Sequence, residues 1–406
     1  MSFVGLALAY LRRRWGQALL SVVVGALGIA AVATAMVGFD ALPRAARQAW
    51  GGVDLVVGSK GSALDLVLCC ALHVADPRGL VSTKTAMAAV HSPMVRAAAP
   101  IALGDNVRGW RIVGTTPALL QIYHARFAQG GPWTGKLQAV AGAIAARTLG
   151  LKPGDTFVGA HGLAGDGELH EHFPYTVVGI LQPTGSVLDR LVLTDIDTVR
   201  YVHVEQARIE KEERGSTDED EGPARFPDAA TAIVAAYRVP TAALLMQRRI
   251  DASDGLSAAN PSLEIARLLG YARPVTVAVA AFGLLLAAIA AAGAAVGLLA
   301  TMTARTKDLA LLRVLGARRF DLATVALSEA AVIGAAALVL GGLLAVALLA
   351  LARDALAERT GLLLQPEVGL FDAGMVIGGT VLVTLLAAAV PALRALHADI
   401  EELLQS

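Results

Sequence analysis

Four segments of the chain are almost entirely apolar and long enough to cross a lipid bilayer, which takes roughly 20 residues of helix. They are predicted at residues 16–39, 274–304, 322–352 and 373–393. The second segment contains no charged residue, and the third contains only Glu329. Continuous apolar runs of this length are typical of transmembrane helices. We therefore predict a membrane protein with four transmembrane α-helices, the first near the N-terminus.

The pattern changes between the first two spans, where residues 40–273 alternate short apolar runs with turns rich in Gly and Pro. Such runs indicate strands. Strands are predicted at 53–57, 111–115, 156–159, 175–181, 190–193 and 231–237, and helices at 41–50, 62–73, 117–123, 195–206 and 261–269, the last feeding into the second span. The densely charged segment 205–221 is expected to be a solvated loop. This region is therefore predicted to fold as a large α+β domain.

Basic residues next to the spans predict their orientation, because Lys and Arg concentrate on the cytoplasmic side. Arg12, Arg13 and Arg14 precede the first span, and five basic residues lie in segment 305–321. In segment 353–372 the two arginines are offset by acidic residues. We expect both termini, segment 305–321 and the tail 394–406 to be cytoplasmic, and 40–273 and 353–372 to be extracytoplasmic.

Cleavage of the first span as a signal peptide at Ala33-Thr34-Ala35 is the weaker alternative. The apolar stretch is longer than an ordinary signal sequence. Cleavage would also leave the three remaining spans at odds with the flanking charges.

Charge and composition exclude several classes of function. Lys plus Arg (34) balances Asp plus Glu (34), so no net field favours nucleic acid. The only cysteines, Cys69 and Cys70, are adjacent, which suits neither a disulfide framework nor a zinc ribbon. No Ser/His/Asp or Cys/His catalytic set is recognisable, so the chain is not expected to be an enzyme.

One phosphate-loop pattern occurs by chance. Residues 130–136 match G-x-x-x-x-G-K, but Leu137 stands where a magnesium-binding Ser or Thr is needed. The predicted topology also places this segment outside the cell, away from ATP. The chain is therefore predicted to lack a nucleotide-binding domain.

The cytoplasmic segment 305–316 carries the most informative motif. Leu311, Val314 and Leu315 fall on one face of a helix, and Gly316 suits its C-terminal end. A short amphipathic helix of this kind can lie on a membrane or insert into a groove of a partner. From the spacing alone, a basic connecting loop is an equally good interpretation.

Four sequence stretches follow one another in an order that is specific when taken together. They are Arg305-x-x-Asp308-Leu309-x-Leu311-Leu312-Arg313-x-Leu315-Gly316-Ala317, Ser328-Glu329-Ala330 at the third span, Pro391–Ala395 after the fourth, and the turn at 145–155. Together with the span order, they resemble the MacB, FtsX and LolE permeases, the four-span type VII class of ABC transporter. The resemblance covers nearly the whole chain.

The resemblance implies a function. In this family two permease copies, or two related permeases, associate with a cytoplasmic ABC ATPase in the bacterial inner membrane. The segment carrying Asp308, Leu311, Leu312, Arg313, Leu315 and Gly316 would be the coupling helix. ATP would be bound by the partner, whose cycle would move a periplasmic domain and so transport or release a substrate, with a periplasmic partner protein possible in such systems. The alternative is an FtsX-like transducer that activates an extracytoplasmic partner without transport.

Three of the eight histidines lie close together in sequence, at His161, His170 and His172, with acidic residues between them. Two imidazoles and a carboxylate are a ligand set that suits zinc. A polar surface loop is the competing interpretation. Stretches at 58–62, 161–163 and 184–190 resemble a branch of the family whose members tend to accompany proteins of metal handling. A zinc site is therefore a hypothesis, and no other cofactor is expected.

Two features of the spans concern packing. Glu329 is costly in a membrane and should face protein or the cytoplasmic interface. The glycine pairs 293/297 and 374/378 have the spacing of close helix contacts. In an Ala-rich chain such spacings also arise by chance.

Overall fold

The computed structural model describes residues 12, 15–162, 167–214, 228–304, 319–360 and 364–397. The chain divides into two compact units. One comprises Met1–Leu42, Tyr271–Ala355 and Gln365–Ser406, and the other Pro43–Gly270 and Leu356–Leu364. We call them the membrane unit and the ectodomain and describe each by itself.

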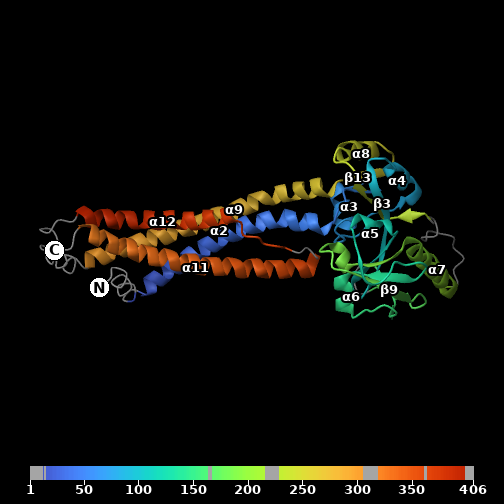
Figure 1. Ribbon diagram of the computed structural model, residues 1–406, viewed down its shortest axis with the longest axis horizontal. Coiled ribbons are helices and arrows are strands. Elements are labelled where there is room, and N and C mark those ends of the chain that lie inside the picture. Colours follow the sequence, from blue (N-terminus) through green and yellow to red (C-terminus); the bar gives the residue numbers. More distant parts are fainter. Residues whose placement is uncertain are drawn as a thin grey trace. The chain divides into compact units, whose positions relative to one another are not determined.

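The membrane unit contains long apolar helices that run alongside one another (Figure 1). They belong to α2 (Trp15–Ala49), α9 (Pro261–Ala304), α11 (Arg319–Thr360) and α12 (Leu370–His397). All four are long and apolar enough to cross a membrane, which confirms the predicted spans. The helix predicted at 41–50 is present up to Ala49, but it is the end of α2, which continues through Pro43 without a break. Helix 261–269 does feed directly into the second span, as part of α9.

Small residues bring these helices together, as is usual where lipid removes the hydrophobic driving force. A side chain on Gly28 would meet the carbonyl oxygen of Gly283 at 2.7 Å, so α2 and α9 touch through their backbones. Gly341 of α11 lies equally close to the carbonyl of Ala26. Gly374 and Gly378, in contrast, face open space among the described residues. The glycine pair 293/297, by contrast, lies against Ser21 and Gln17 of α2, so one of the two pairs noted in the sequence makes a helix contact.

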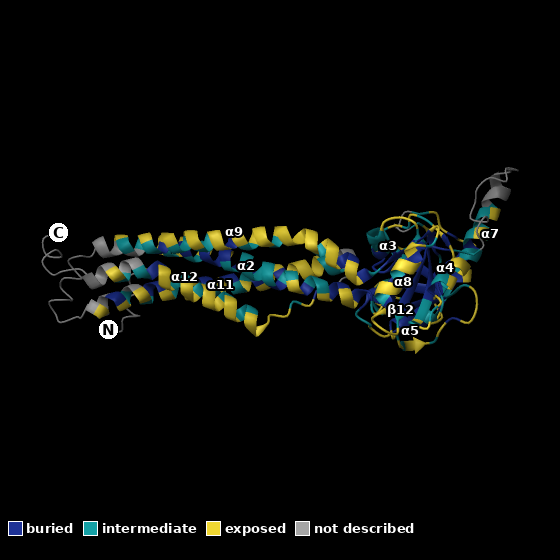
Figure 2. Cartoon of the chain, turned by 90° about the horizontal axis from the view of Figure 1, so that it is seen from above, coloured by how far each residue is buried: buried dark blue, intermediate teal, exposed yellow. Residues whose placement is uncertain are grey.

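The membrane-unit helices carry many exposed large apolar side chains, and Figure 2 colours long stretches of these helices as exposed. Only 6% of the most apolar window of α9 is buried. An apolar surface of this size would be unfavourable in water. It suits contact with lipid.

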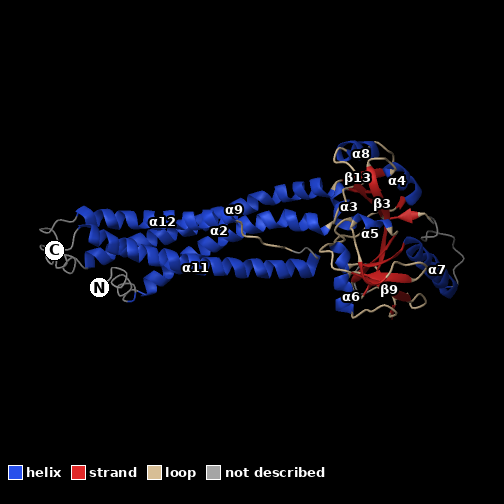
Figure 3. Ribbon diagram, viewed as in Figure 1, coloured by secondary structure: helices blue, strands red, loops and turns tan. Residues whose placement is uncertain are grey.

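The ectodomain is built on a mixed sheet whose strand order is β13-β1-β12-β3-β4-β10-β6-β9-β5 (Figure 3). These strands are β1 (Leu55–Ser59), β3 (Val95–Val107), β4 (Trp110–Thr115), β5 (Phe127–Gly130), β6 (Gln138–Ala141), β9 (Tyr175–Leu181), β10 (Val192–Asp195), β12 (Ala232–Tyr237) and β13 (Leu256–Ala259). Short strands β7 (Thr156–Phe157) and β8 (Ala160–His161) pair with β9 and β3, and β2 (Val81–Ser82) pairs with β11 (Ala229–Ala230).

Helices pack against this sheet and complete the predicted α+β domain. They are α3 (Ala63–Cys70), α4 (Thr83–Val90), α5 (Ala118–Ile122), α6 (Ala143–Leu149), α7 (Ile196–Arg214), α8 (Ala242–Asp251) and the 3₁₀ turn η1 (Val187–Arg190). Cys69 and Cys70 are free and buried in the core.

Strand β9 has the bounds predicted for it, because its residues alternate strictly between more and less buried positions. The predicted loop 205–221 is wrong over its first half. Helix α7 continues to Arg214, where Glu205 and Arg208 form an ion pair one turn apart and Ile209 packs against the core. The phosphate-loop pattern at 130–136 begins at the last residue of β5, and the next element is strand β6, not a helix.

Candidate metal centre

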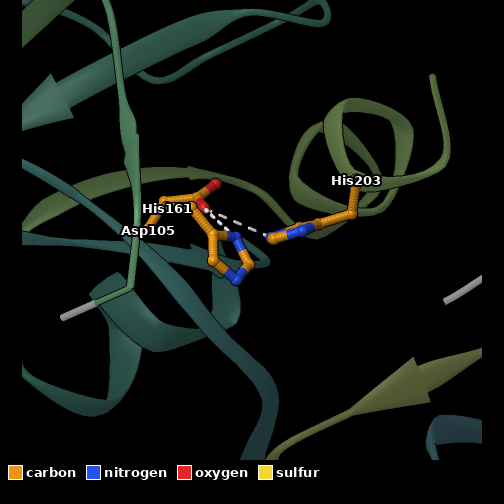
Figure 4. Close-up of side chains that lie close together, drawn as sticks. All are labelled: Asp105, His161 and His203. Atoms are coloured by element: carbon orange, nitrogen blue, oxygen red, sulfur yellow. Dashed lines mark ion pairs between the residues drawn. The ribbon is translucent and has the colours of Figure 1, made fainter. Parts of the chain in front are cut away.

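Four ionisable side chains of the ectodomain meet around one carboxylate oxygen. The Oδ1 atom of Asp105 lies 3.2 Å from Nε2 of His170, 3.3 Å from Nε2 of His203 and 3.9 Å from Nδ1 of His161. Figure 4 shows His161 and His203 directed toward Asp105 from different parts of the chain. Among the described residues, one ligand atom each of Asp105, His161 and His203 lie within 4.8 Å of one another.

Asp105 is placed by an irregularity in β3. The register between β3 and β4 shifts between Leu103 and Asp105, so Gly104 is an extra residue in the ladder. Such bulges re-aim the side chains beside them. As a result, the carboxylate of Asp105 is fully buried. A charged side chain at this position contributes nothing to the pairing of the strand.

His161 is held by the short strand β8, which pairs with β3 at Asp105 and Asn106. The Asn106 amide donates hydrogen bonds to the carbonyls of Ala160 (3.4 Å) and Gly162 (3.0 Å). The side chain of His161 remains 61% exposed. The backbone at His161 is thus fixed while its ring faces solvent.

His203 comes from α7, which lies against the sheet through Val199 and Val202. Its ring approaches the sheet where Gly104 has no side chain. A Cβ atom on Gly104 would lie 2.9 Å from Nε2 of His203. The glycine in the bulge therefore makes room for this imidazole.

His170 completes the cluster from the segment that follows β8. Its backbone N–H donates to the carbonyl of Gly159, and its side chain is only 3% exposed. The rings of His161, His170 and His203 are 5.3–5.9 Å apart between centroids and meet edge to face in every pair. The three imidazoles thus surround Asp105 without stacking.

The carboxylate at the centre is charged. Burial alone would raise the pKa of Asp105, but hydrogen bonds from His170 and His203 and the proximity of their rings hold this pKa at about 2. Its second oxygen, Oδ2, is buried and has no hydrogen-bond partner among the described residues. A buried anion is costly unless it is paired, and a cation bound at Oδ1 would offset its charge.

The sequence identified this cluster in part. His161 and His170 lie together, whereas His172 is exposed on the next turn and lies outside the cluster. Asp105 and His203 were missed. The only sequence signal for His203 is its place beside apolar positions of a predicted helix. The only sequence signal for Asp105 is that an acidic residue stands within a largely apolar stretch.

The other candidate residues lie in the membrane unit. Glu329 is buried on α11. Asp308, Leu311, Leu312, Arg313, Leu315 and Gly316 lie outside the described residues.

Two solved structures are similar to the ectodomain at low identity. The periplasmic region of MacB from Actinobacillus actinomycetemcomitans is 11% identical with a TM-score of 0.34, covering 55% of this chain and 94% of that one. The extracellular domain of the noncanonic ABC-type transporter YknZ from Gram-positive bacteria is 10% identical with a TM-score of 0.30, covering 51% and 99%. No curated protein matches the chain.

Two protein families match the sequence in succession. Residues 18–243 match the MacB-like periplasmic core domain, which covers more than half of the chain. Residues 280–400 match the FtsX-like permease C-terminal family. The first match covers most of the first span and of the ectodomain, and the second covers the later part of the second span and the last two spans. The chain therefore belongs to the MacB/FtsX-like permeases of ABC transporters and is a multi-pass membrane protein.

Proposed function

We propose that this permease is powered by a separate cytoplasmic ATPase, which binds the segment between α9 and α11, and that the ATPase cycle moves the ectodomain at the outer face. The observation that carries the proposal is the order of the two family matches along one chain. A MacB-like periplasmic core domain and an FtsX-like C-terminal part are joined in one chain.

The proposed coupling segment lies between the second and third spans of the chain. Helix α9 ends at Ala304 and α11 begins at Arg319, so the basic segment 305–318 joins two successive spans. The basic residues in this segment support a cytoplasmic location for it, where ATP is available. Leu311 and Leu315 would share one apolar helix face, and such a face fits a groove on a partner.

The ectodomain is the part that such a cycle would move. Helix α2 leads into it without a break, and α9 starts in it at Pro261 and continues into the membrane unit. Helices that run through both units can transmit a displacement from one to the other. We propose that two permease copies act together in the bacterial inner membrane, with the ectodomain in the periplasm, to transport or release a substrate there.

Replacement of Leu311 and Leu315 by Asp tests the coupling segment. Burying an unpaired charge in an interface costs several kcal/mol, so the double variant should lose the ATPase on co-purification while still inserting into the membrane. Thr306→Asp is the matched control, because Thr306 lies about 140° around the helix from Leu311. It should retain the ATPase. Equal retention by the double variant would contradict the proposed interface.

A further inference from the structure

We propose that Asp105, His161 and His203 bind a zinc ion in the ectodomain, with His170 positioning the Asp105 carboxylate. This inference goes beyond the proposed function and does not depend on which ATPase the permease uses. It rests on three features of the cluster: the spacing of its donor atoms, their chemical types, and the space that Gly104 leaves for His203.

The donor atoms lie within 4.8 Å of one another, somewhat wider than a closed tetrahedral site. Zinc bonds to nitrogen and oxygen are about 2.0–2.1 Å long, so neighbouring ligands of a tetrahedral ion lie roughly 3.3 Å apart. The Nε2 of His203 is 3.3 Å from Oδ1 of Asp105, and the Nδ1 of His161 is 3.9 Å from it. A small inward movement of His161, whose ring is mostly exposed, would close the set.

The ring geometry agrees with the same centre. An imidazole that binds zinc through one nitrogen has its centroid about 3.2 Å from the ion, which sets two such rings roughly 5.2 Å apart. The centroids of His161 and His203 are 5.3 Å apart, with an interplanar angle of 76°. These rings do not stack, and each directs a nitrogen toward Asp105.

Hydrogen bonding alone accounts poorly for the cluster. Imidazole N–H groups hydrogen-bonded to an ionised carboxylate usually approach to about 2.7–2.9 Å. Here the contacts to Oδ1 are 3.2–3.9 Å, and Oδ2 is buried with no partner among the described residues. A divalent ion held between Oδ1 and the two imidazoles would offset the charge of the carboxylate.

The donor set selects the class of metal. Two imidazoles and one carboxylate suit zinc and similar transition metals, whereas calcium and magnesium take oxygen ligands. Cys69 and Cys70 are buried in the core formed around α3 and do not belong to the cluster. With three protein ligands, the fourth position is left for water or for a ligand that arrives from solvent on the exposed side of His161.

His170 has a supporting place in this arrangement. It is buried, and its Nε2 lies 3.2 Å from Oδ1 of Asp105, the same oxygen that faces the other two rings. Ligating carboxylates are commonly oriented by such a hydrogen bond, and its loss typically weakens metal binding about 10–100-fold. His170 is therefore a positioning residue, and its loss should weaken binding without abolishing the site.

The ion would join parts of the ectodomain that are otherwise held by apolar packing. Asp105 lies on β3, His161 on β8 and His203 on α7. Coordination by all three would fix α7 to the bulged part of β3. Metal occupancy should therefore stabilise the ectodomain, since a ligand that binds only the folded state shifts the unfolding equilibrium.

Zinc titration of the full-length protein in detergent tests this proposal. Calorimetry with zinc chloride should show one saturable site in addition to any weak surface sites. His161→Ala should lower the affinity of that site at least about tenfold, and His161→Ala/His203→Ala should remove it. His161 is mostly exposed, so its replacement leaves the core intact.

His172→Ala is the matched control, because His172 is an exposed histidine two positions from His170 and lies outside the cluster. It should bind zinc as the wild type does. Cobalt absorption gives an independent readout: a tetrahedral nitrogen and oxygen site produces visible bands that the double variant should lack. Binding that persists unchanged in the double variant, or that is lost in His172→Ala, would overturn the assignment.

Discussion

The Nε2 atom of His203 lies 3.3 Å from Oδ1 of Asp105, which brings a helix and a strand from distant parts of the sequence to one polar contact. Around it, α7 is held by apolar residues such as Val199 and Val202. The contact depends on the missing side chain of Gly104. A charged group in an apolar interface is costly unless it is paired. The buried carboxylate of Asp105 is therefore better explained by a function than by the stability of the fold.

Gly104→Ala should disturb this contact specifically. The added methyl group would lie 2.9 Å from Nε2 of His203 and push the ring away from Asp105. We expect zinc affinity to fall at least about tenfold, as for the loss of a supporting contact. Gly131→Ala is the control, because nothing described lies within 4 Å of its added Cβ. Calorimetry on both variants checks this, and equal affinities would show that Gly104 does not set the position of His203.

The ectodomain should lose stability in acid through Asp228. Its side chain accepts hydrogen bonds from the Lys84 N–H and the Ser82 hydroxyl, and these, with nearby Arg200 and Lys84, lower the pKa of Asp228. A lowered folded-state pKa stabilises the protein above the unfolded-state value, about 3.9, and this contribution is lost as pH falls through the folded pKa.

Thermal unfolding of Asp228→Asn checks this. The variant should unfold at a lower temperature than wild type at pH 7, and the two should converge below about pH 4. Asp254→Asn, at an exposed position, should have the same unfolding temperature as the wild type both at pH 7 and below about pH 4. A difference for Asp228→Asn that is independent of pH would point to lost packing instead of lost charge.

Two adjacent glycines of α11 should respond differently to alanine. A Cβ on Gly341 would meet the Ala26 carbonyl at 2.7 Å, whereas Gly342 has nothing within 4 Å. Gly341→Ala should destabilise the membrane unit by about 1–3 kcal/mol through overpacking. Gly342→Ala should be neutral or slightly stabilising. Thermal stability measured by size-exclusion chromatography separates the two, and similar losses in both would contradict the α2–α11 contact.

The predicted topology can be tested by cysteine labelling. In a background without Cys69 and Cys70, Gly135→Cys should react with an impermeant reagent in intact cells, since Gly135 is exposed on the ectodomain. Ala317→Cys should react only after the membrane is opened, since basic segments remain in the cytoplasm. Labelling of both positions in intact cells would contradict the proposed orientation.

The spans and one strand were predictable from local pattern. Long apolar runs identify membrane helices because lipid leaves a helix few alternatives, and β9 alternates regularly. Strand β3 was not predicted, although it is the longest strand described. Its residues are rich in Ala and include Pro100 and Gly104, all of which disfavour strands on local grounds. Pairing with β12, β4 and β8 overrides that preference.

The residues of the metal cluster were predicted only in part, because strand β3 was not predicted. Asp105 could not be assigned to a site without β3, and His203 lies far from His161 in sequence. The closeness of His170 and His172 in the sequence predicts that both belong to one site. Instead, His170 is buried and the next two residues turn outward. Only tertiary structure brings the three imidazoles around one carboxylate.

The central claim is that ATP use by a separate subunit moves the ectodomain, and a distance measurement tests it most directly. A spin label on Gly135→Cys, in a background without Cys69 and Cys70, would report the separation of two ectodomains in the reconstituted permease–ATPase complex. The account predicts that ATP changes this distance distribution, and that the Leu311→Asp/Leu315→Asp variant shows no change. An identical distribution with and without ATP, in a complex that is hydrolysing ATP, would contradict it.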